Sequence, residues 1–436
     1  MLNFDSGRSL RFNGWRFSSI VVIMTFALSM VASFLLPGWL GAKEWFMSGD
    51  YWATVNSAQW VSHLAMGTVY QANPFYSALP GFLLLLSPVV AIGDHFGLVT
   101  GYAMPLRYPS MWLLVGPACF VMGSTFVFGV DYLCETLYIS QFRRKAILVV
   151  SSPLIGVATL VVAGHPEDLL ALGFACLAFG FLLRGNAIAG AWMIAVAILM
   201  QTWAGLLLPT FIMASPVRKR VPVAIRAIGP PASLGALLLA LDFRHAELDL
   251  LKQPLVGFGQ HLPWWKVAPT VIIKGYSRYP IVGIAGSNSR IGAVLVALIL
   301  GILVSRTKKP ELVIGAGALS LAARGIFESE FWPYYLVPAT VFLLISAASS
   351  TSTKRWIAAS VLALELYLTA PASYIYVSYS PWLALALLFA TSIGSFMLGT
   401  GNAFVEKVIF QESSVAKIWR KTPWRGLAGD SLIDLE

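Results

Sequence analysis

Several polar side chains in this sequence interrupt long apolar runs, where they could take part in chemistry. The first is Asp50 in "SGDYWATVNSAQWV", a carboxylate placed among aromatic residues. Aspartate is a favoured helix N-cap, so a structural role is one interpretation. The other is a general base, because apolar neighbours desolvate a carboxylate and raise its pKa. The residue types alone leave both interpretations open.

A second polar group is the turn "GHPED" at residues 164–168, between two apolar segments. Proline at the first helical position and acids in the first turn are ordinary helix start signals. Glu167 and Asp168 are therefore explained as part of a helix start. His165 has no such explanation, so we treat it as a candidate binding residue.

The third group is "QTW" at residues 201–203, which interrupts an apolar run that would otherwise be continuous. Polar groups at membrane depth are costly and tend to face a cavity. Backbone that is not helical at that depth is tolerated where it lines such a cavity. We therefore expect a broken helix here, with Gln201 and Trp203 lining a pocket.

Two further segments contain charged candidates. "RGIFESEFWPYY" contains Arg324, Glu330 and Tyr334, which form either an ion pair beside an interfacial aromatic belt or part of a binding pocket. Arg107 is either a flanking residue that extends its charge towards water or a cation that binds phosphate. Both alternatives stay open in each case.

The elements that must position these residues are predicted to be transmembrane helices. The chain has 436 residues, of which 58% are hydrophobic and 11% charged, whereas soluble domains carry about 25% charged residues. Apolar runs long enough to cross a bilayer recur along the chain. We predict an all-α polytopic helical bundle, one transmembrane domain over residues 1–436, with 12 to 14 passes. The expected spans are 17–36, 78–93, 109–131, 146–163, 168–183, 187–202, 204–214, 222–241, 291–304, 311–325, 333–348, 356–371 and 382–398.

The orientation follows from the basic residues. The net charge of +10 would suggest nucleic-acid binding in a soluble domain, but these residues cluster in short loops, as the positive-inside rule predicts. This places both termini and the basic tail at 400–436 in the cytoplasm, and loops 41–77 and 242–290 outside. A second pass within 95–108 is then expected, to keep Arg143 inside. Residues 50–66 are predicted to form an amphipathic helix on the outer membrane surface.

Motifs of soluble enzymes are missing from the sequence. It contains no Walker A loop, no dinucleotide-binding glycine pattern, no HExxH and no serine nucleophile elbow. The three cysteines have no metal-ligand spacing, and a lone carboxylate is a weak divalent site. We therefore expect no bound cofactor, no obligatory metal and no nucleic-acid partner.

Three motifs in order resemble bacterial glycosyltransferases of the GT-C fold. They are "VYQANPFYSALPGFLLLLSPV", the block "GHPEDLLALGFACLAFGFLLRG" with "AGAWMIAVAILMQTWAGLLLP", and "PYYLVP". The group they resemble uses polyprenyl-phosphate sugars and is mannosyl- or arabinosyltransferase-like, of actinobacterial type. The resemblance covers residues 45–215 and, beyond them, the late Tyr-x-x-Pro element. Two positions depart from that pattern, because Gln201 or Thr202 replaces a lysine and Tyr334 replaces a histidine.

The resemblance implies an inverting sugar transfer at the outer face of the cytoplasmic membrane. The donor would be a polyprenyl-phosphate sugar, the acceptor a glycolipid or glycan, and the surrounding partners membrane lipids. Asp50 would take the proton of the acceptor hydroxyl. His165, Arg107 and Arg324 would contact phosphate or sugar, and Gln201, Trp203, Glu330 and Tyr334 would line the pocket. The alternatives are a secondary transporter or lipid flippase, or a membrane scaffold without catalysis.

Overall fold

The computed structural model describes most of the helical part of the chain. The described residues are 15–39, 49–72, 78–98, 113–247, 250, 255–256, 271–273, 276–279, 290–307, 309–327, 333–350, 352–353, 355–361 and 363–364. The predicted span 382–398 and the tail 400–436 lie outside them.

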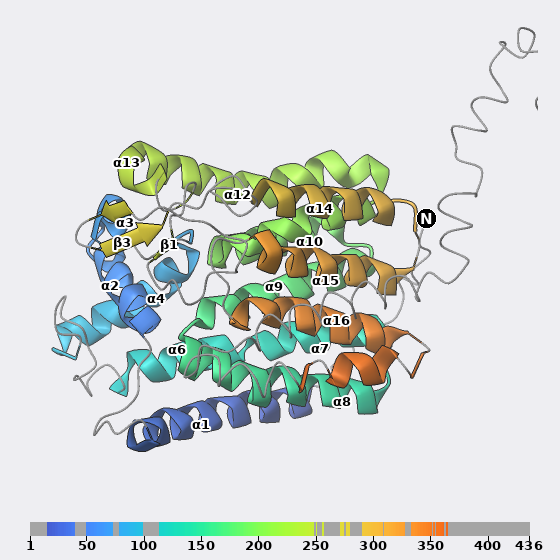
Figure 1. Cartoon of the computed structure of the whole chain (residues 1–436), viewed down its shortest axis with the longest axis horizontal. Coiled ribbons are helices and arrows are strands. Elements are labelled where there is room, and N and C mark those ends of the chain that lie inside the picture. The colour runs from blue at the N-terminus through green and yellow to red at the C-terminus, as the bar shows by residue number, and fades with distance from the viewer. Residues whose placement is uncertain are drawn as a thin grey trace, which may run out of the picture.

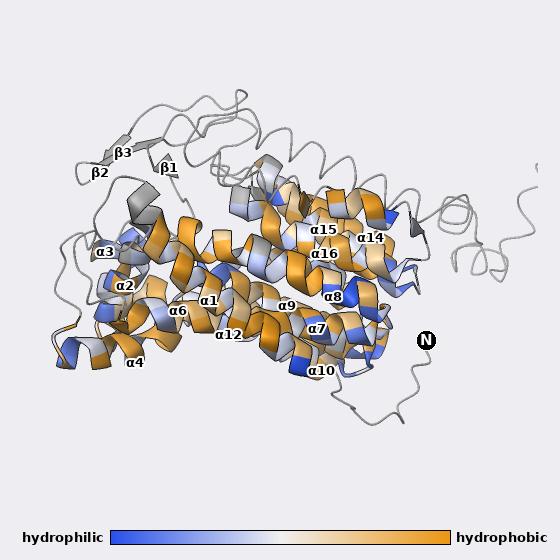
Figure 2. Cartoon of the chain, turned by 90° about the horizontal axis from the view of Figure 1, so that it is seen from below, coloured by the Kyte–Doolittle hydropathy of each residue, from blue (hydrophilic) through white to orange (hydrophobic). Residues whose placement is uncertain are grey.

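Long helices lie side by side in one layered bundle (Figure 1), and most of the residues along them are hydrophobic (Figure 2). Five of the described helices are long and apolar enough to cross a membrane: Arg16–Leu35, Val115–Thr136, Gln141–Ala163, Pro166–Leu183 and Val217–Leu241. The prediction of a helical membrane protein is confirmed to this extent.

The helices of the first half are α1 (Trp15–Trp39), α2 (Gly49–Ser62), α3 (Val69–Ala72), α4 (Gly81–His95), α6 (Val115–Ser124), α7 (Phe126–Thr136), α8 (Gln141–Val149), α9 (Pro166–Leu183) and α10 (Ala187–Met200). Those of the second half are α11 (Leu208–Ala214), α12 (Arg220–Leu241), α13 (Phe243–Ala246), α14 (Arg290–Val304), α15 (Pro310–Phe327) and α16 (Val337–Ser349). Short 3-10 turns occupy Met66–Thr68, Thr202–Leu207, Val217–Lys219 and Pro333–Leu336. Two π-helical stretches, Val150–Gly156 and Ala158–Ala163, continue α8.

The described part of the chain is almost entirely helical, as the all-α prediction states, and contains one small sheet besides. Three short strands, β1 (Leu255–Val256), β2 (Val271–Ile273) and β3 (Tyr276–Tyr279), form an antiparallel sheet in the order β1-β3-β2. Their β-branched and aromatic residues suit a pleated sheet. The sequence predicts one long loop over 242–290, because strands this short have too few residues to show a clear two-residue alternation.

The segment predicted as a span at 78–93 differs from expectation. α4 has 15 residues, and at about 1.5 Å per residue it is shorter than the hydrocarbon core. It lies with α2, α3 and the strands at one end of the long helices (Figure 1). The single span Val115–Thr136 then leads from this end to the other. The second pass expected within 95–108 lies mostly outside the described residues, which stop at 98 and resume at 113.

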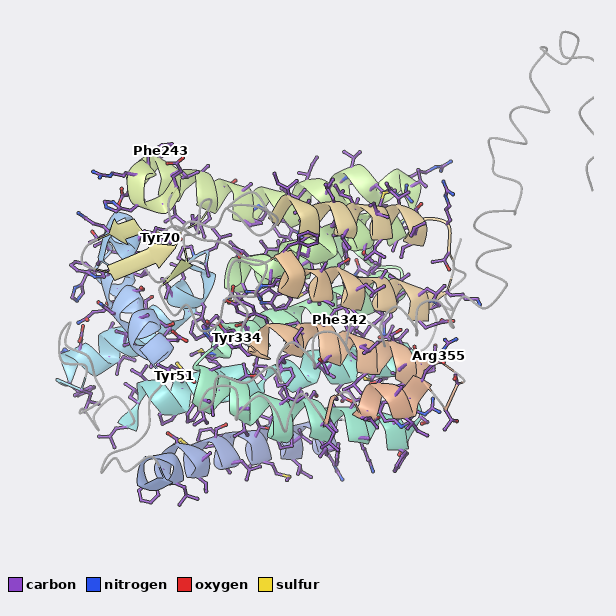
Figure 3. All side chains as sticks on the ribbon, in the orientation of Figure 1. Tyr51, Tyr70, Phe243, Tyr334, Phe342 and Arg355 are labelled. Carbon is purple, nitrogen blue, oxygen red and sulfur yellow. The ribbon has the colours of Figure 1, made fainter. Side chains whose placement is uncertain are left out.

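The basic loops do meet at the opposite end of the bundle. Arg143 donates hydrogen bonds to the carbonyl oxygens of Ala348 and Ser350, at 3.0 and 2.8 Å. Its guanidinium also lies 5.9 Å from the ring centroid of Trp356. Figure 3 shows the neighbouring Arg355 at this end, far from Tyr51. These arginines lie together at one end of the bundle, as expected if the basic loops are all on one side of the membrane.

Near this basic end, the buried Asp131 and three partly buried charged residues form an ion-pair network that the sequence did not predict. Arg144 is hydrogen-bonded to Asp131, and Arg144 also lies 3.3 Å from Glu135. Arg184 pairs with the same Glu135 at 3.6 Å. Buried charges persist when they are paired in this way, so we assign the network a structural role.

Close helix packing in the core depends on small residues. A Cβ atom on Gly129 of α7 would lie 2.1 Å from the carbonyl oxygen of Gly173 on α9. Only glycine allows the two backbones to approach so closely. This contact fixes α9, whose first turn contains the polar residues of the candidate site.

Candidate functional site

The candidate site is assembled from two helix starts and one helix break. Asp50 lies in the first turn of α2 and is half-exposed, with 57% of its side chain accessible. His165 directly precedes α9, whose first residue is Pro166. The preceding Gly164 has a φ of 77°, a left-handed conformation that ends the previous helix. This turn directs His165 towards α2.

His165 lies between two carboxylates. Its Nε2 atom is 3.1 Å from Asp50 Oδ2, and its Nδ1 atom is 2.6 Å from Glu167 Oε1. Burial lowers the pKa of His165, but the charges and hydrogen bonds of Glu167 and Asp50 together raise it well above its ordinary value. Each ring nitrogen thus faces a carboxylate oxygen, an arrangement that favours the protonated imidazole.

Aromatic rings hold the imidazole in place. Tyr334 stacks on His165 with 4.3 Å between the ring centroids and 25° between the planes. Tyr335 packs edge-on against Tyr334 at 4.7 Å, and the guanidinium of Arg324 lies 3.8 Å from the Tyr335 ring centroid. A cation over a ring face is attracted by the quadrupole of the ring. The late Tyr-Tyr pair therefore joins Arg324 to His165.

The helix break at residues 201–203 is present, as predicted. α10 ends at Met200, Gln201 is extended, and a 3-10 turn begins at Thr202. The indole N–H of Trp203 donates to Asp168, which also lies 3.8 Å from His165 Nδ1. The break thus links α10 to the first turn of α9.

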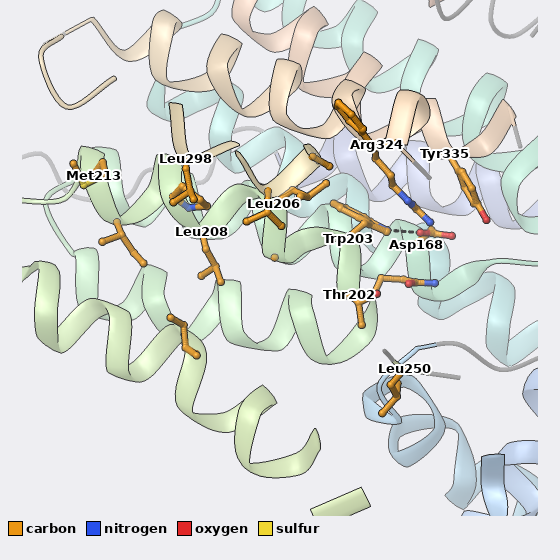
Figure 4. A pocket seen from close by; sticks show the side chains of 18 of the residues that line it. Asp168, Thr202, Trp203, Leu206, Leu208, Met213, Leu250, Leu298, Arg324 and Tyr335 are labelled. Atoms are coloured by element: carbon orange, nitrogen blue, oxygen red, sulfur yellow. Dashed lines mark hydrogen bonds between the residues drawn. The ribbon is translucent and has the colours of Figure 1, made fainter. Parts of the chain in front are cut away.

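A cavity of about 650 Å³ extends from this cluster between the helices. Its polar end is lined by His165, Asp168, Gln201, Thr202, Trp203, Arg324, Tyr334 and Tyr335. Its remaining wall is apolar and comes mainly from α11 and α14. Figure 4 shows Leu206, Leu208, Leu298 and Met213 continuing away from Asp168 and Arg324. The cavity is therefore amphipathic along its length.

The apolar part of the cavity is open at its side. Ile228 on α12 and Val294, Leu298 and Ile302 on α14 all line it and are each 44% to 50% exposed. From Ala293 to Ile302 the lining follows α14 for about 14 Å. These exposed side chains lie on helices that are apolar on their outer surface, so the opening faces the region that lipid would occupy.

The structure brings together most of the residues that sequence analysis selected. His165, Gln201, Trp203, Arg324 and Tyr334 line one cavity, and Asp50 contacts His165 at its edge. Arg107 and Glu330 lie outside the described residues.

The structure does not agree with the prediction of an amphipathic surface helix over residues 50–66. After the half-exposed Asp50, the described side chains of α2 are buried or partly buried, including the polar Asn56, Ser57 and Gln59, so they do not form the expected exposed polar face. Because α4 packs against it and Gln59 donates to Asp94 of α4, the polar side is covered by protein.

Sequence analysis missed the part that Glu167 and Asp168 play. They were explained as a helix start, which is correct, since α9 begins at Pro166. Both are also buried, with side chains only 3% and 5% exposed. Two adjacent acids beside a histidine are a signal that could have been weighed more heavily, because a helix start needs no buried acid. With His165 they offer three ligand atoms within 4.8 Å of one another, a group that could hold a metal ion.

No protein-family model and no curated protein matches this chain. The fold and the cavity define it as a helical membrane protein with an amphipathic pocket. The resemblance to GT-C glycosyltransferases stays a hypothesis.

Proposed function

We propose that this chain is a membrane glycosyltransferase that uses a polyprenyl-phosphate sugar as donor. It transfers a hexose, with mannose as the first candidate, or a pentose to a hydroxyl of a lipid or cell-envelope glycan, with inversion. The chain sits in the cytoplasmic membrane with both termini inside and the reaction outside. The observation that supports this most is the amphipathic cavity, whose polar end holds His165 and Arg324 beside Asp50.

The cavity suits a lipid-linked donor. The prenyl chain occupies the apolar wall and leaves through the side opening, where Leu298 and Ile302 are half-exposed. The phosphate and sugar occupy the polar end. The prenyl chain passes from lipid to an apolar wall without being exposed to water, so its entry into the cavity costs little free energy.

The chemistry needs one base and positive charge. Asp50 takes the proton of the acceptor hydroxyl as its oxygen attacks the anomeric carbon. The bond from that carbon to the phosphate oxygen breaks, and the electron pair leaves with the phosphate. Arg324 and His165 stabilise the charge that develops there. A single displacement of this kind inverts the anomeric configuration.

The test compares transfer with transport in proteoliposomes of the purified chain. With a radiolabelled polyprenyl-phosphate sugar and a membrane glycolipid fraction, we expect labelled glycolipid to form. A transporter or flippase would instead move label or lipid across the membrane without forming a glycosidic bond. That result would contradict the proposal.

Narrowing the apolar part of the cavity should weaken binding of the donor. We expect Leu298→Trp to raise the KM for a long-chain donor about tenfold with little change in kcat, because overpacking costs about 1–3 kcal/mol. Leu237→Trp is the matched control, since Leu237 is 48% exposed on α12 and does not line the cavity. Steady-state kinetics with donors of two chain lengths measure the effect. Equal KM values in the two variants would show that the prenyl chain of the donor does not lie along this apolar wall.

A further inference from the structure

The buried acids beside His165 have oxygen atoms that the hydrogen bonds of the site do not satisfy. Among the described residues, Glu167 Oε2 and Asp168 Oδ2 are buried and have no hydrogen-bond partner. A buried carboxylate oxygen without a partner is costly and calls for an explanation, such as an ion. Both atoms belong to side chains that are more than nine-tenths buried.

His165, Glu167 and Asp168 each offer one ligand atom, and these three atoms lie within 4.8 Å of one another. His165 Nδ1 lies 2.6 Å from Glu167 Oε1 and 3.8 Å from Asp168 Oδ2. Two ligands of one tetrahedral ion with bonds of about 2.0–2.1 Å lie about 3.3 Å apart, a value between these distances. Catalytic zinc sites have three protein ligands, which include histidine and carboxylate side chains, and leave the fourth position open.

The second contact of the imidazole also fits a metal ligand. A histidine that binds a metal through one ring nitrogen commonly donates its other N–H to a carboxylate, which fixes the orientation of the ring. His165 Nε2 has this partner in Asp50, at 3.1 Å. The stack with Tyr334 restrains the same ring from its face.

Charge favours a divalent cation at this position. Asp50, Glu167 and Asp168 bring three carboxylates to one histidine, and Arg324 points towards Asp168 from the cavity wall (Figure 4). A proton on Nδ1 supplies one positive charge, whereas a divalent cation in its place supplies two. An anionic phosphate in the cavity would add further negative charge to the cluster, which increases this need.

We infer that His165 Nδ1, Glu167 and Asp168 form a binding site for a divalent first-row metal ion such as Mn²⁺ or Zn²⁺. His165 and Asp168 also line the cavity, so the open position of the ion faces the polar end. Imidazole with carboxylates suits these ions. The site stands on the described residues alone, and only its use in holding a donor phosphate rests on the proposed function.

The experiment titrates the purified full-length chain, first treated with a chelator, with Mn²⁺ and follows free Mn²⁺ by electron paramagnetic resonance. We expect one saturable site per wild-type chain. Glu167→Gln and Asp168→Asn should each weaken it at least tenfold. Glu311→Gln is the matched control, because Glu311 lies in the first turn of α15, away from the cavity, and should leave binding unchanged.

A second measurement needs only the wild-type chain, in case a variant does not fold. Electron spin-echo modulation of bound Mn²⁺ should show coupling to one directly bound imidazole nitrogen. No saturable binding, equal binding in all variants, or bound Mn²⁺ without this coupling would overturn the site. A chain that transfers sugar without binding Mn²⁺ would overturn the site alone. A chain that binds Mn²⁺ here and transfers no sugar would contradict only the proposed function.

Discussion

Replacing Asp50 by asparagine is expected to lower kcat for sugar transfer by about 10²- to 10⁴-fold, the usual contribution of a general base. Asparagine has nearly the same shape, and its Oδ1 atom still accepts a hydrogen bond from His165 Nε2. It cannot take the proton of the acceptor hydroxyl. The measurement is the initial rate of glycolipid formation at saturating donor.

The control for this variant is Asp94→Asn. Asp94 belongs to α4 and accepts two hydrogen bonds from Gln59, at 2.8 and 3.1 Å, away from the cavity. We expect its rate to stay within a factor of two of the wild type. An Asp50→Asn chain that is folded and retains the wild-type rate would remove Asp50 from the role of base. The helix-start interpretation of Asp50 would then be sufficient.

Replacing Arg324 by methionine is expected to lower kcat by about 10²- to 10³-fold, as does removal of one group that stabilises transition-state charge. Methionine keeps much of the length and the apolar contact with Tyr335, but has no charge to offer the leaving phosphate. Arg324→Lys should recover part of the rate, because lysine restores the charge without the planar fork. Single-turnover kinetics separate this loss from weaker donor binding.

Arg306→Met is the matched control for Arg324. Arg306 follows α14 at the basic end of the bundle and is exposed. Its replacement should change the rate less than twofold. If Arg324→Met and Arg306→Met have the same kcat, the guanidinium over Tyr335 acts only in packing.

Polar residues that are costly in a membrane predicted the location of the cavity. Gln201 and Trp203 interrupt an apolar run, and that cost predicted both the helix break and the cavity behind it. His165 was selected because its turn did not require it, and it lies at the centre of the site. Local pattern is sufficient in these cases, because the environment of a membrane helix is known in advance.

Contacts between distant segments could not be predicted in the same way. Asp50 and His165 are 115 positions apart, and only packing of α2 against the bundle joins them. The polar residues of α2 are typical of a surface helix. They are buried only because α4 packs against them, and the local sequence does not show this contact. Likewise, Asp131 and Arg144 lie on different helices, and only the fold brings them into contact.

The anomeric configuration of the product tests the central claim most directly. The purified chain in nanodiscs is given a polyprenyl-phosphate sugar of one defined anomer, and the new glycosidic bond is examined by nuclear magnetic resonance. A single displacement assisted by Asp50 predicts one product, with configuration opposite to that of the donor. Retention of configuration, or consumption of the donor without a new glycosidic bond, would contradict it.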